Sequence, residues 1–308
     1  MVNLNVNIDG LKLKNPIMPA SGTFSDDLHK VFDLNLLGAH VAKTITPEIR
    51  YGNPTPRISE VENGILNSIG IPSNGIDYFI NEILPVYKKY NCPFIASISA
   101  LTIDEFCKIC EKISIEGIDA IEVNISCPNL EDNGKAFAMS SKSTFNVIKK
   151  LRSVTNFPLW TKLTPNTGEI IEVAQSAEEA GSNALVVTNT ILAMKIDITT
   201  KKPTLGNVMG GLSGPVIKPV ALRMVYQCSK IVKIPIIGCG GISSAADVIE
   251  FFLAGASAAQ IGTATFRNPK IMLSIIDDLE SYCKNNNIKN ISDLIGMVDD
   301  KNMLNSEF

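Results

Sequence analysis

Short apolar runs alternate with amphipathic stretches along most of this chain. The apolar runs are rich in valine, isoleucine and alanine, which is typical of strands buried on both faces of a parallel sheet. The amphipathic stretches predict helices; in one of them Val248 and Phe252 lie on an apolar stripe that ends at Gly255, as helices often do. The predicted strands are 17–20, 39–43, 93–98, 120–124, 158–162, 184–188, 234–238 and 259–262.

Eight strands that alternate with helices over a chain of this length favour a (β/α)8 TIM barrel. The alternative is an open, doubly wound sheet, which would carry a G-x-G-x-x-G fingerprint after its first strand. Here the first strand ends in A-S-G-T at residues 20–23, which lacks that fingerprint. We therefore predict a barrel that forms one domain over residues 1–308, an α/β fold.

The ends of the chain and two connections depart from a plain barrel. Residues 3–14 alternate around Asp9-Gly10, which predicts an N-terminal β-hairpin that caps the barrel as part of residues 1–15. The connections 46–75 and 189–219 are too long for simple barrel loops, so we expect small insertions with extra elements or a function. Residues 299–308 form a polar tail.

Composition excludes several classes of function. The 308 residues are 45% hydrophobic and 19% charged, which suits a globular chain with a sizeable core. A net charge of −3 gives no basic field for nucleic acid. No apolar run is long enough to span a membrane, and Lys12 and Lys14 stand where a signal peptide would need apolar residues. We expect a cytoplasmic protein that binds neither nucleic acid nor membrane.

The cysteines support a reducing compartment. They number seven and are scattered through apolar segments, which favours free thiols over a disulfide framework. Cys107 and Cys110 form a C-x-x-C motif, but they lie in a helical pattern with no second pair nearby. Core packing is therefore expected there, and no metal site is predicted.

The residues that follow the predicted strands carry the candidate chemistry, because the carboxyl ends of all barrel strands face one site. Two lysines, Lys43 and Lys162, end apolar strands, so a solvated surface position fits them poorly. The full set at these ends is Ser21, Gly22, Lys43, Thr44, Ser97, Asn124, Cys127, Lys162, Thr188, Asn189, Thr190, Gly240, Gly241, Gly262 and Thr263.

The residue types in this set indicate a phosphate and a proton transfer. Glycines after the last two strands can hold a phosphate through bare backbone N–H groups. The chain's two histidines lie outside the set, which argues against a metal cluster and against a Cys–His nucleophile at Cys127. A thiol that accepts a proton, with Lys162 able to neutralise a reduced isoalloxazine, suits a flavin enzyme.

Seven motifs resemble those of class 1 dihydroorotate dehydrogenases, in the same order over about residues 15–269. They are L-N-S-I-G-I at 66–71, N-I-S-C-P-N at 124–129, K-L-T-P-N at 162–166, N-T at 189–190, G-G-L-S-G-P at 210–215, I-G-C-G-G-I at 237–242 and Q-I-G-T at 260–263. The sequences of K-L-T-P-N and of the segment that begins at residue 210 resemble those of subclass 1B. In that subclass the FMN barrel forms a homodimer core joined by two electron-transfer subunits, and these carry FAD and an iron–sulfur cluster of the 2Fe–2S type and pass electrons to NAD+.

The resemblance implies a role for each matching residue. Cys127 would remove the C5 proton of dihydroorotate while hydride moves from C6 to FMN N5, and Lys43 would lie between flavin and substrate as a second catalytic residue. Substrate contacts would come from Lys43, Asn67, Ser68, Ile69, Gly70, Ile71, Asn124, Asn189 and Thr190. Contacts to one FMN per chain would come from Ser21, Lys43, Thr44, Ser97, Asn124, Lys162, Thr188, Gly214, Gly240, Gly241, Gly262 and Thr263.

Two positions depart from the pattern of the family. Ser97 stands where this subclass usually has an asparagine near the flavin, so its shorter hydroxyl is expected to reach the cofactor only through water. The loop after Cys127, residues 130–134, carries Glu131 and Asp132 beside a site that expects an anionic substrate. Gly134 in that loop would still allow a lid to close over the ligand.

Other functions stay open on the sequence alone. The nearest are a class 1A-like enzyme that uses fumarate and a dihydropyrimidine dehydrogenase-like barrel. A different class is a Schiff-base phosphosugar lyase with Lys162 or Lys43 as the amine. A ligand-binding barrel without catalysis has no use for two lysines beside a thiol.

Overall fold

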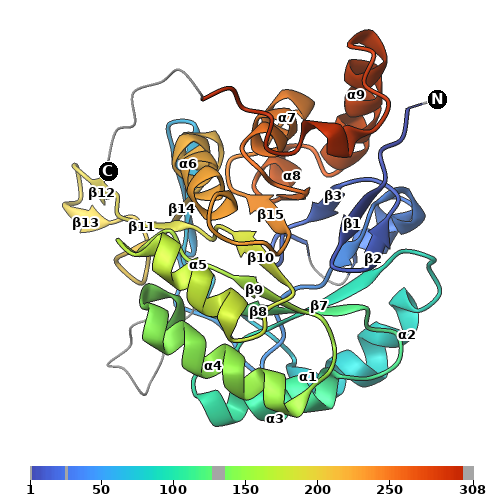
Figure 1. Cartoon of the computed structure of the whole chain (residues 1–308). Helices are drawn as coiled ribbons and strands as arrows, with labels where there is room; N and C mark the ends of the chain where they lie inside the picture. The colour runs from blue at the N-terminus through green and yellow to red at the C-terminus, as the bar shows by residue number, and fades with distance from the viewer. Residues whose placement is uncertain (1, 25–26, 127–135, 301–308) are drawn as a thin grey trace.

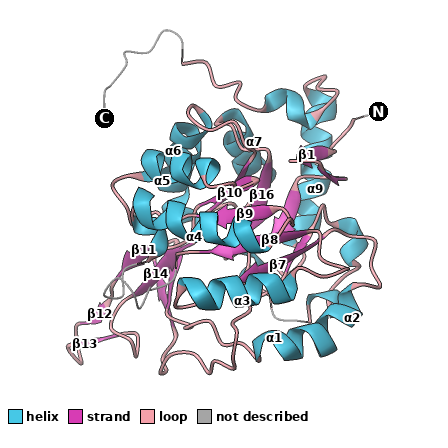
Figure 2. Cartoon of the chain, turned by 60° about the horizontal axis from the view of Figure 1, so that its bottom comes forward, coloured by secondary structure: helices cyan, strands magenta, loops and turns pink. Residues whose placement is uncertain are grey.

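Eight parallel strands form the centre of the molecule and confirm the predicted barrel (Figures 1 and 2). The computed structural model describes residues 2–24, 27–126 and 136–300. Neighbouring strands follow the order β3-β16-β15-β10-β9-β8-β7-β4. The two edge strands meet where the amide of Gly38 donates to the carbonyl of Ile17 at 3.0 Å. The barrel strands are β3 Ile17–Pro19, β4 His40–Val41, β7 Phe94–Ile98, β8 Ala120–Asn124, β9 Leu159–Lys162, β10 Ala184–Val187, β15 Ile236–Cys239 and β16 Ala258–Ile261.

Helices surround these strands on the outside, as Figure 2 shows. Several begin at residues with good capping chemistry: Thr102 and Glu105 form a capping box at α3, and Ser244 caps α7. The α-helices are α1 Gly75–Tyr78, α2 Leu84–Tyr87, α3 Ile103–Ile113, α4 Ser141–Val154, α5 Ile170–Glu179, α6 Lys218–Ser229, α7 Ala245–Leu253, α8 Ala264–Arg267 and α9 Ile271–Asn285. Shorter helical turns are η1 Leu28–Lys30, η2 Leu34–Leu36, η3 Phe79–Ile83, η5 Phe137–Met139, η6 Pro215–Ile217 and η7 Ile291–Leu294.

The hydrophobic core lies on the outer face of the barrel strands and beneath the helices. In β8, Ile121 and Val123 are fully buried, and in α7 the predicted stripe of Val248 and Phe252 is fully buried as well. The C-x-x-C motif lies within α3, where Cys110 is buried in the core. Among the described residues no group of three or more metal-ligating side chains occurs.

The N-terminal hairpin is present as predicted. Its strands are β1 Val6–Ile8 and β2 Leu11–Leu13, which pair antiparallel. Asp9 and Gly10 form the turn with φ of 47° and 92°, as a two-residue type I′ turn requires. The side chains of Ile8 and Leu13 are buried in the core.

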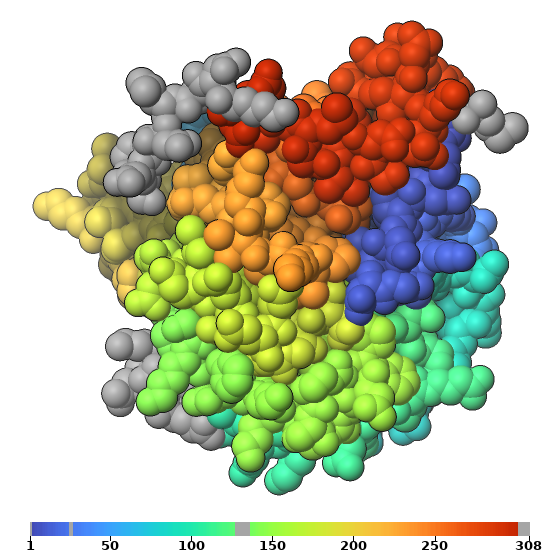
Figure 3. Space-filling view, in the orientation of Figure 1, coloured from blue at the N-terminus to red at the C-terminus, as the bar shows by residue number. Residues whose placement is uncertain are grey.

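The two long connections pair with each other, which the sequence did not indicate. The first carries β5 Ile58–Val61 and β6 Gly64–Asn67, and the second carries β11 Ile191–Ala193 and β14 Gly210–Ser213. They form one antiparallel sheet in the order β11-β14-β6-β5. Between β11 and β14 a small arm of β12 Ile196–Asp197 and β13 Lys202–Pro203 projects from the molecule (Figures 1 and 3).

The start of the predicted polar tail is tied to the barrel. The carboxylate of Asp300 accepts hydrogen bonds from the Tyr226 hydroxyl and, at 2.9 Å, from the Lys230 ammonium on and after α6. Residues 301–308 lie outside the described part of the chain. Within the described part, no helix combines the length and the apolar character that a membrane crossing demands.

Candidate active site at the carboxyl ends of the barrel strands

A buried ring of polar side chains lies inside the barrel, below the strand ends. Lys162, the last residue of β9, donates to the Ser21 hydroxyl at 3.1 Å and to the Gln260 carbonyl oxygen at 2.9 Å. Ser21 and Gln260 in turn donate to the two carboxylate oxygens of Glu122, at 2.5 and 2.7 Å. Lys162 and Glu122 therefore face each other across two bridging side chains, with Nζ and Oε1 3.7 Å apart.

Two further hydroxyls extend this ring toward β4. Ser97 donates to Glu122 Oε1 at 2.9 Å, and Thr44 lies 3.0 Å from the Ser97 hydroxyl. Ser21, Thr44, Ser97 and Lys162 all belong to the set that the sequence predicted at the cofactor. The structure brings these four together around one carboxylate.

The sequence reasoning missed Glu122 and Gln260. Both are fully buried inside the barrel. The available signal was a charged residue at the centre of an apolar strand, in the run A-I-E-V-N. Because side chains alternate along a strand, Glu122 shares the inward face with Asn124, which was recognised.

A second polar chain joins β8 to the loop after β10. The Ser126 hydroxyl donates to Asn124 Oδ1 at 2.6 Å and accepts a hydrogen bond from Asn189 Nδ2. The backbone N–H of Thr190 donates to Asn189 Oδ1 at 2.8 Å, and the Thr188 hydroxyl donates to the Asn189 carbonyl at 3.0 Å. These contacts bring the residues predicted after strands 120–124 and 184–188 to one side of the mouth.

The segment 67–71 is shaped by hydrogen bonds to the first insertion. Asn53 donates from its backbone to Ile69 O at 3.1 Å and from its side chain to the Ser68 hydroxyl at 2.8 Å. Gly70 has a φ of 78°, and a Cβ there would lie 2.5 Å from Asn53 Oδ1, so glycine is required for this close approach. Asn67 reaches across the insertion sheet, where its side chain donates to Gly211 O at 3.2 Å.

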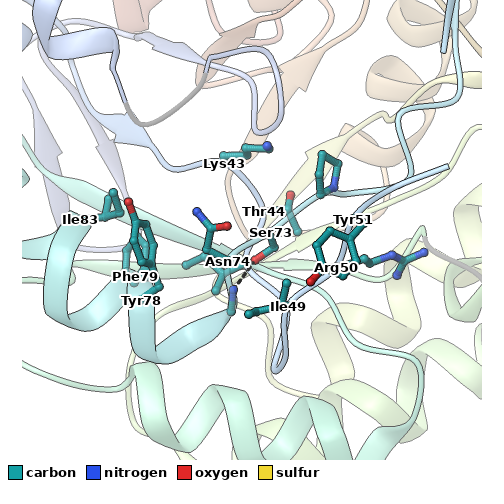
Figure 4. Close-up of a pocket in the computed structure, with 13 residues that line it drawn as sticks. Lys43, Thr44, Ile49, Arg50, Tyr51, Ser73, Asn74, Tyr78, Phe79 and Ile83 are labelled. Carbon is teal, nitrogen blue, oxygen red and sulfur yellow. Dashed lines mark hydrogen bonds between the residues drawn. The ribbon is translucent and has the colours of Figure 1, made fainter. Parts of the chain in front are cut away.

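Lys43 lies apart from the ring, at the edge of a neighbouring pocket (Figure 4). Its side chain is half-buried, and its ammonium forms no hydrogen bond or ion pair with any residue that the structure describes. The pocket has a volume of about 230 Å³ and is lined by Lys43, Thr44, Ile45, Ile49, Arg50, Tyr51, Pro72, Ser73, Asn74, Gly75, Tyr78, Phe79 and Ile83. A lysine beside a cavity in this way is available to a ligand.

The turns after β15 and β16 present bare backbone amides. None of the N–H groups of Gly240, Gly241, Gly262 and Thr263 donates to an oxygen of the described residues. Gly241 has a φ of 78°, and a Cβ there would lie 2.7 Å from the backbone nitrogen of Lys218, so only glycine fits. Unpaired amides that follow the last two barrel strands suit an anionic phosphate.

Gly214 completes this amide cradle on the side of the second insertion. It adopts a φ of 96° at the start of η6. A Cβ at this position would lie 3.7 Å from the methyl group of Thr263, so the loops at 214 and 263 adjoin.

A charged brace holds the turn after β15 in place. The Asp247 carboxylate accepts from the backbone and hydroxyl of Ser243, from the Ser244 hydroxyl at 3.0 Å and from the Lys218 ammonium at 2.7 Å. Burial alone would raise the pKa of Asp247, but the hydrogen bonds from Lys218 and the two serines outweigh it and lower that pKa. The hydrogen bond to Asp247 raises the pKa of Lys218.

Cys127, the predicted base, lies outside the described residues, together with the loop 130–134. A described thiol, Cys239, stands at the end of β15. Burial raises its pKa, which keeps it protonated, and so it is a poor proton acceptor at neutral pH.

Comparison with known proteins adds to this geometry. The family model described as dihydroorotate dehydrogenase matches residues 3–283. The dihydroorotate dehydrogenase B (NAD(+)) catalytic subunit of Thermoanaerobacter sp. strain X514 is 46% identical over 299 residues, which cover 96% of this chain and 99% of that protein. The protein of the same name from Malacoplasma penetrans strain HF-2 is 45% identical over 296 residues, with 95% and 97% covered.

A solved structure supports the architecture. The crystal structure of DHODH from Eimeria tenella in complex with ferulenol superimposes with a TM-score of 0.78 and 24% sequence identity. The match covers 96% of this chain and 88% of that one. At this identity the likeness concerns the fold, and it agrees with the eight-stranded barrel described above.

Proposed function

The chain belongs to the dihydroorotate dehydrogenase family, and from that premise we propose that its flavin is FMN, held at the barrel mouth with its phosphate on the turns after β15 and β16. It is an enzyme of pyrimidine biosynthesis that oxidises dihydroorotate to orotate, of the B type that is linked to NAD+. The observation that carries the FMN proposal is the cradle of free amides at Gly240, Gly241, Gly262 and Thr263.

The donor set at the mouth fits a flavin mononucleotide. The cradle offers several N–H groups and no carboxylate, which matches a phosphate group. Lys162 supplies one buried cation for the isoalloxazine ring of the flavin. Further contacts to the flavin would come from the side chains of Ser21, Thr44 and Thr188 and from the backbone of Gly214. FMN, when bound, supplies the acceptor for the hydride that leaves C6 of dihydroorotate.

We propose that the substrate is held by Lys43, by Asn124, Asn189 and Thr190, and by the segment 67–71. Asn124 and Asn189 are linked through the Ser126 hydroxyl, and Asn67 and Thr190 both lie against Gly211. Carboxamides carry both donors and acceptors, which suits the ring of a dihydropyrimidine, and the free Lys43 ammonium suits its carboxylate.

Cys127 is proposed as the base that takes the proton from C5, which leaves the C5–C6 double bond of orotate once hydride departs from C6. This role rests on the motif N-I-S-C-P-N, whose Asn124 and Ser126 lie at the mouth.

The lyase alternative is less well supported by the geometry. A Schiff base requires an uncharged amine that is free to attack a carbonyl. Lys162 instead donates to Ser21 and Gln260 beside the Glu122 carboxylate, an arrangement that suits an ammonium cation.

The chain works with a partner, since its relatives are named catalytic subunits. We propose a homodimer core joined by two electron-transfer subunits in a heterotetramer, with FAD and a 2Fe–2S cluster on the partner chain, where NAD+ is reduced. We also propose that residues 1–308 act as one domain in the cytoplasm. The described cysteines are all free, which supports a reducing compartment.

The choice of FMN is tested by comparing FMN with riboflavin on flavin-free protein. We expect FMN to bind at least about tenfold more tightly, because only FMN carries the phosphate, and tenfold corresponds to about 1.4 kcal/mol. Quenching of flavin fluorescence during titration measures both affinities. Equal affinities would contradict the phosphate cradle, and tighter binding of FAD than of FMN would assign a different flavin.

A further inference from the structure

We propose that Glu122 is a positioning residue that lowers the reduction potential of the bound flavin. It does so by fixing the net charge, and the direction of the hydrogen bonds, in the group of polar side chains around Lys162. The inference rests on the proposed FMN site. It concerns a side chain to which the proposed FMN site assigns no contact with the flavin.

The surroundings of Glu122 are those of an ionised carboxylate. The side chain is 0% exposed, and it receives hydrogen bonds from Ser21, Ser97 and Gln260. Every one of these partners donates, and the Lys162 ammonium lies 3.7 Å from the same carboxylate. A carboxylate accepts only, so three donors and a cation match its charged form. A buried charge that is paired and fully hydrogen-bonded in this way is tolerated.

This carboxylate decides where the neighbouring protons point. Ser21 and Ser97 each have one hydroxyl proton, and both protons are directed to Glu122. Because the Ser97 proton is used, Thr44 must be the donor in its 3.0 Å contact with Ser97. Ser21 and Thr44 therefore offer only lone pairs to a ligand above them.

Lys162 is left as the cation that can donate to the flavin. Two of its three N–H groups are used by Ser21 and Gln260. The third remains for a ligand at the mouth. The orientation of this donor is fixed by its two acceptors, both of which are held by Glu122.

The ring also sets the local charge. Glu122 and Lys162 sum to zero net charge in a buried region, where charges interact strongly. If the carboxylate were replaced by a neutral amide, one positive charge would remain beneath the flavin. Reduction adds negative charge to the flavin ring, so this change would favour the reduced cofactor and raise its potential.

The test compares the midpoint potential of bound FMN in the wild type, in Glu122→Gln and in the double variant Glu122→Gln/Gln260→Glu. We expect Glu122→Gln to raise the ratio of reduced to oxidised flavin at least tenfold, which is about 30 mV for a two-electron couple. The double variant exchanges the amide and the carboxylate between two side chains that already contact each other at 2.7 Å. It restores one negative charge and one donor-acceptor pair, so its potential should return toward the wild-type value.

Thr161→Val is the matched control. Thr161 precedes Lys162 in β9, but its hydroxyl pairs with Ser182 on the outer face of the barrel. This variant should leave the potential unchanged.

The proposal is overturned if Glu122→Gln binds FMN at the wild-type potential, or if the double variant is shifted as far as the single one. It is equally overturned if neither Glu122 variant retains flavin while Thr161→Val does, because Glu122 would then serve to retain the flavin and not to set its potential. A wild-type chain that binds no flavin would instead remove the proposed function.

Discussion

At the scale of single residues, a charged side chain inside the barrel and the proposed proton acceptor are different residues of one segment. Inside the barrel, Glu122, Lys162 and their hydroxyl and amide partners are all held by hydrogen bonds. Cys127 follows the strand that carries Glu122, only five positions further along the chain. The two parts can therefore be altered separately, and their variants should differ in what they affect.

Replacing Cys127 by serine should slow dihydroorotate oxidation by about 10²–10⁴-fold, the usual contribution of a positioned base. Flavin and orotate should still bind, since neither depends on the thiol. In the wild type, turnover should rise with pH through the ionisation of the thiol, which for a free cysteine lies near 8.5. Stopped-flow measurement of flavin reduction gives the rate and its pH dependence, over about pH 6–10 so that the thiol ionisation is covered.

Cys107→Ser is the control for this experiment, because Cys107 lies within α3 on the outside of the barrel. It should keep the wild-type rate and pH profile. Near wild-type reduction by Cys127→Ser at neutral pH would mean that another group removes the C5 proton.

At the scale of elements, the turn after β15 depends on a brace from two helices. Lys218 begins α6 and Asp247 lies in the first turn of α7, and their ion pair spans the turn that carries Gly240 and Gly241. Both helices would have to shift for this turn to move. The amides that we assign to the phosphate are thus presented by a rigid frame.

Asp247→Asn should weaken FMN binding about tenfold, or about 1.4 kcal/mol, because the amide is uncharged and keeps one acceptor oxygen, so it cannot hold the two serines on one oxygen and the Lys218 ammonium on the other. Glu250→Gln is the control: Glu250 contacts Lys218 at 2.9 Å but none of the turn residues, so affinity should stay within about twofold. Fluorescence titration measures both variants. Equal losses in the two would show that only the charge of Lys218 matters.

The brace also has a defined pH range. The pKa of Asp247 is lowered in the folded protein, so its stabilisation is complete above the ordinary carboxyl value of about 3.9 and is lost as the pH falls through the lowered value. The pKa of Lys218 is raised, so its stabilisation is complete below about 10.4 and is lost as the pH rises through the raised value. Between these limits the brace should not vary with pH.

The sequence predicted the elements well where periodicity was strong, with ends that moved by one or two residues. The last two predicted strands show this: 234–238 became Ile236–Cys239, since Pro235 has no N–H for the ladder, and 259–262 became Ala258–Ile261. The four-stranded insertion sheet was not predictable, because Asn67 and Gly211 pair across 144 positions and short strands carry little periodicity. The ion pair of Lys218 and Asp247 could not be predicted either, because only the fold brings α6 and α7 together.

The sequence identified the candidate residues at or just after the carboxyl ends of the predicted strands, but not those that lie further back within them. Ser21, Thr44, Ser97 and Lys162 could be listed together because barrel strands end at one mouth, and the structure places them in one network. Glu122 and Gln260 lie within their strands and not after them. Their role can be inferred only once their hydrogen-bond partners from other strands are known.

At the scale of the whole molecule, the segments that lead into the first two barrel strands make a crowded contact where the barrel closes. Gly38 donates to Ile17 O, and a Cβ at Gly38 would lie only 1.9 Å from Asn15 O. Backbone cannot yield there without separating β3 from β4. These strands carry Ser21 and Thr44 at their ends, so closure and the shape of the mouth are linked.

Gly38→Ala should therefore destabilise the protein by about 1–3 kcal/mol or more, the usual cost of overpacking a well-filled interior. Urea unfolding should show a lower midpoint with an unchanged slope. Gly168→Ala is the control, since a Cβ at Gly168 meets nothing within 4 Å. An unchanged midpoint for Gly38→Ala would show that the two strands separate without cost.

The central claim is that this barrel oxidises dihydroorotate with its own flavin. The most direct test adds dihydroorotate without oxygen to the purified chain loaded with FMN and follows the visible absorbance. We predict that the oxidised flavin bands bleach in proportion to the substrate added, and that NADH forms from NAD+ only once the electron-transfer subunit is present. Flavin bands that persist under excess dihydroorotate would contradict the account.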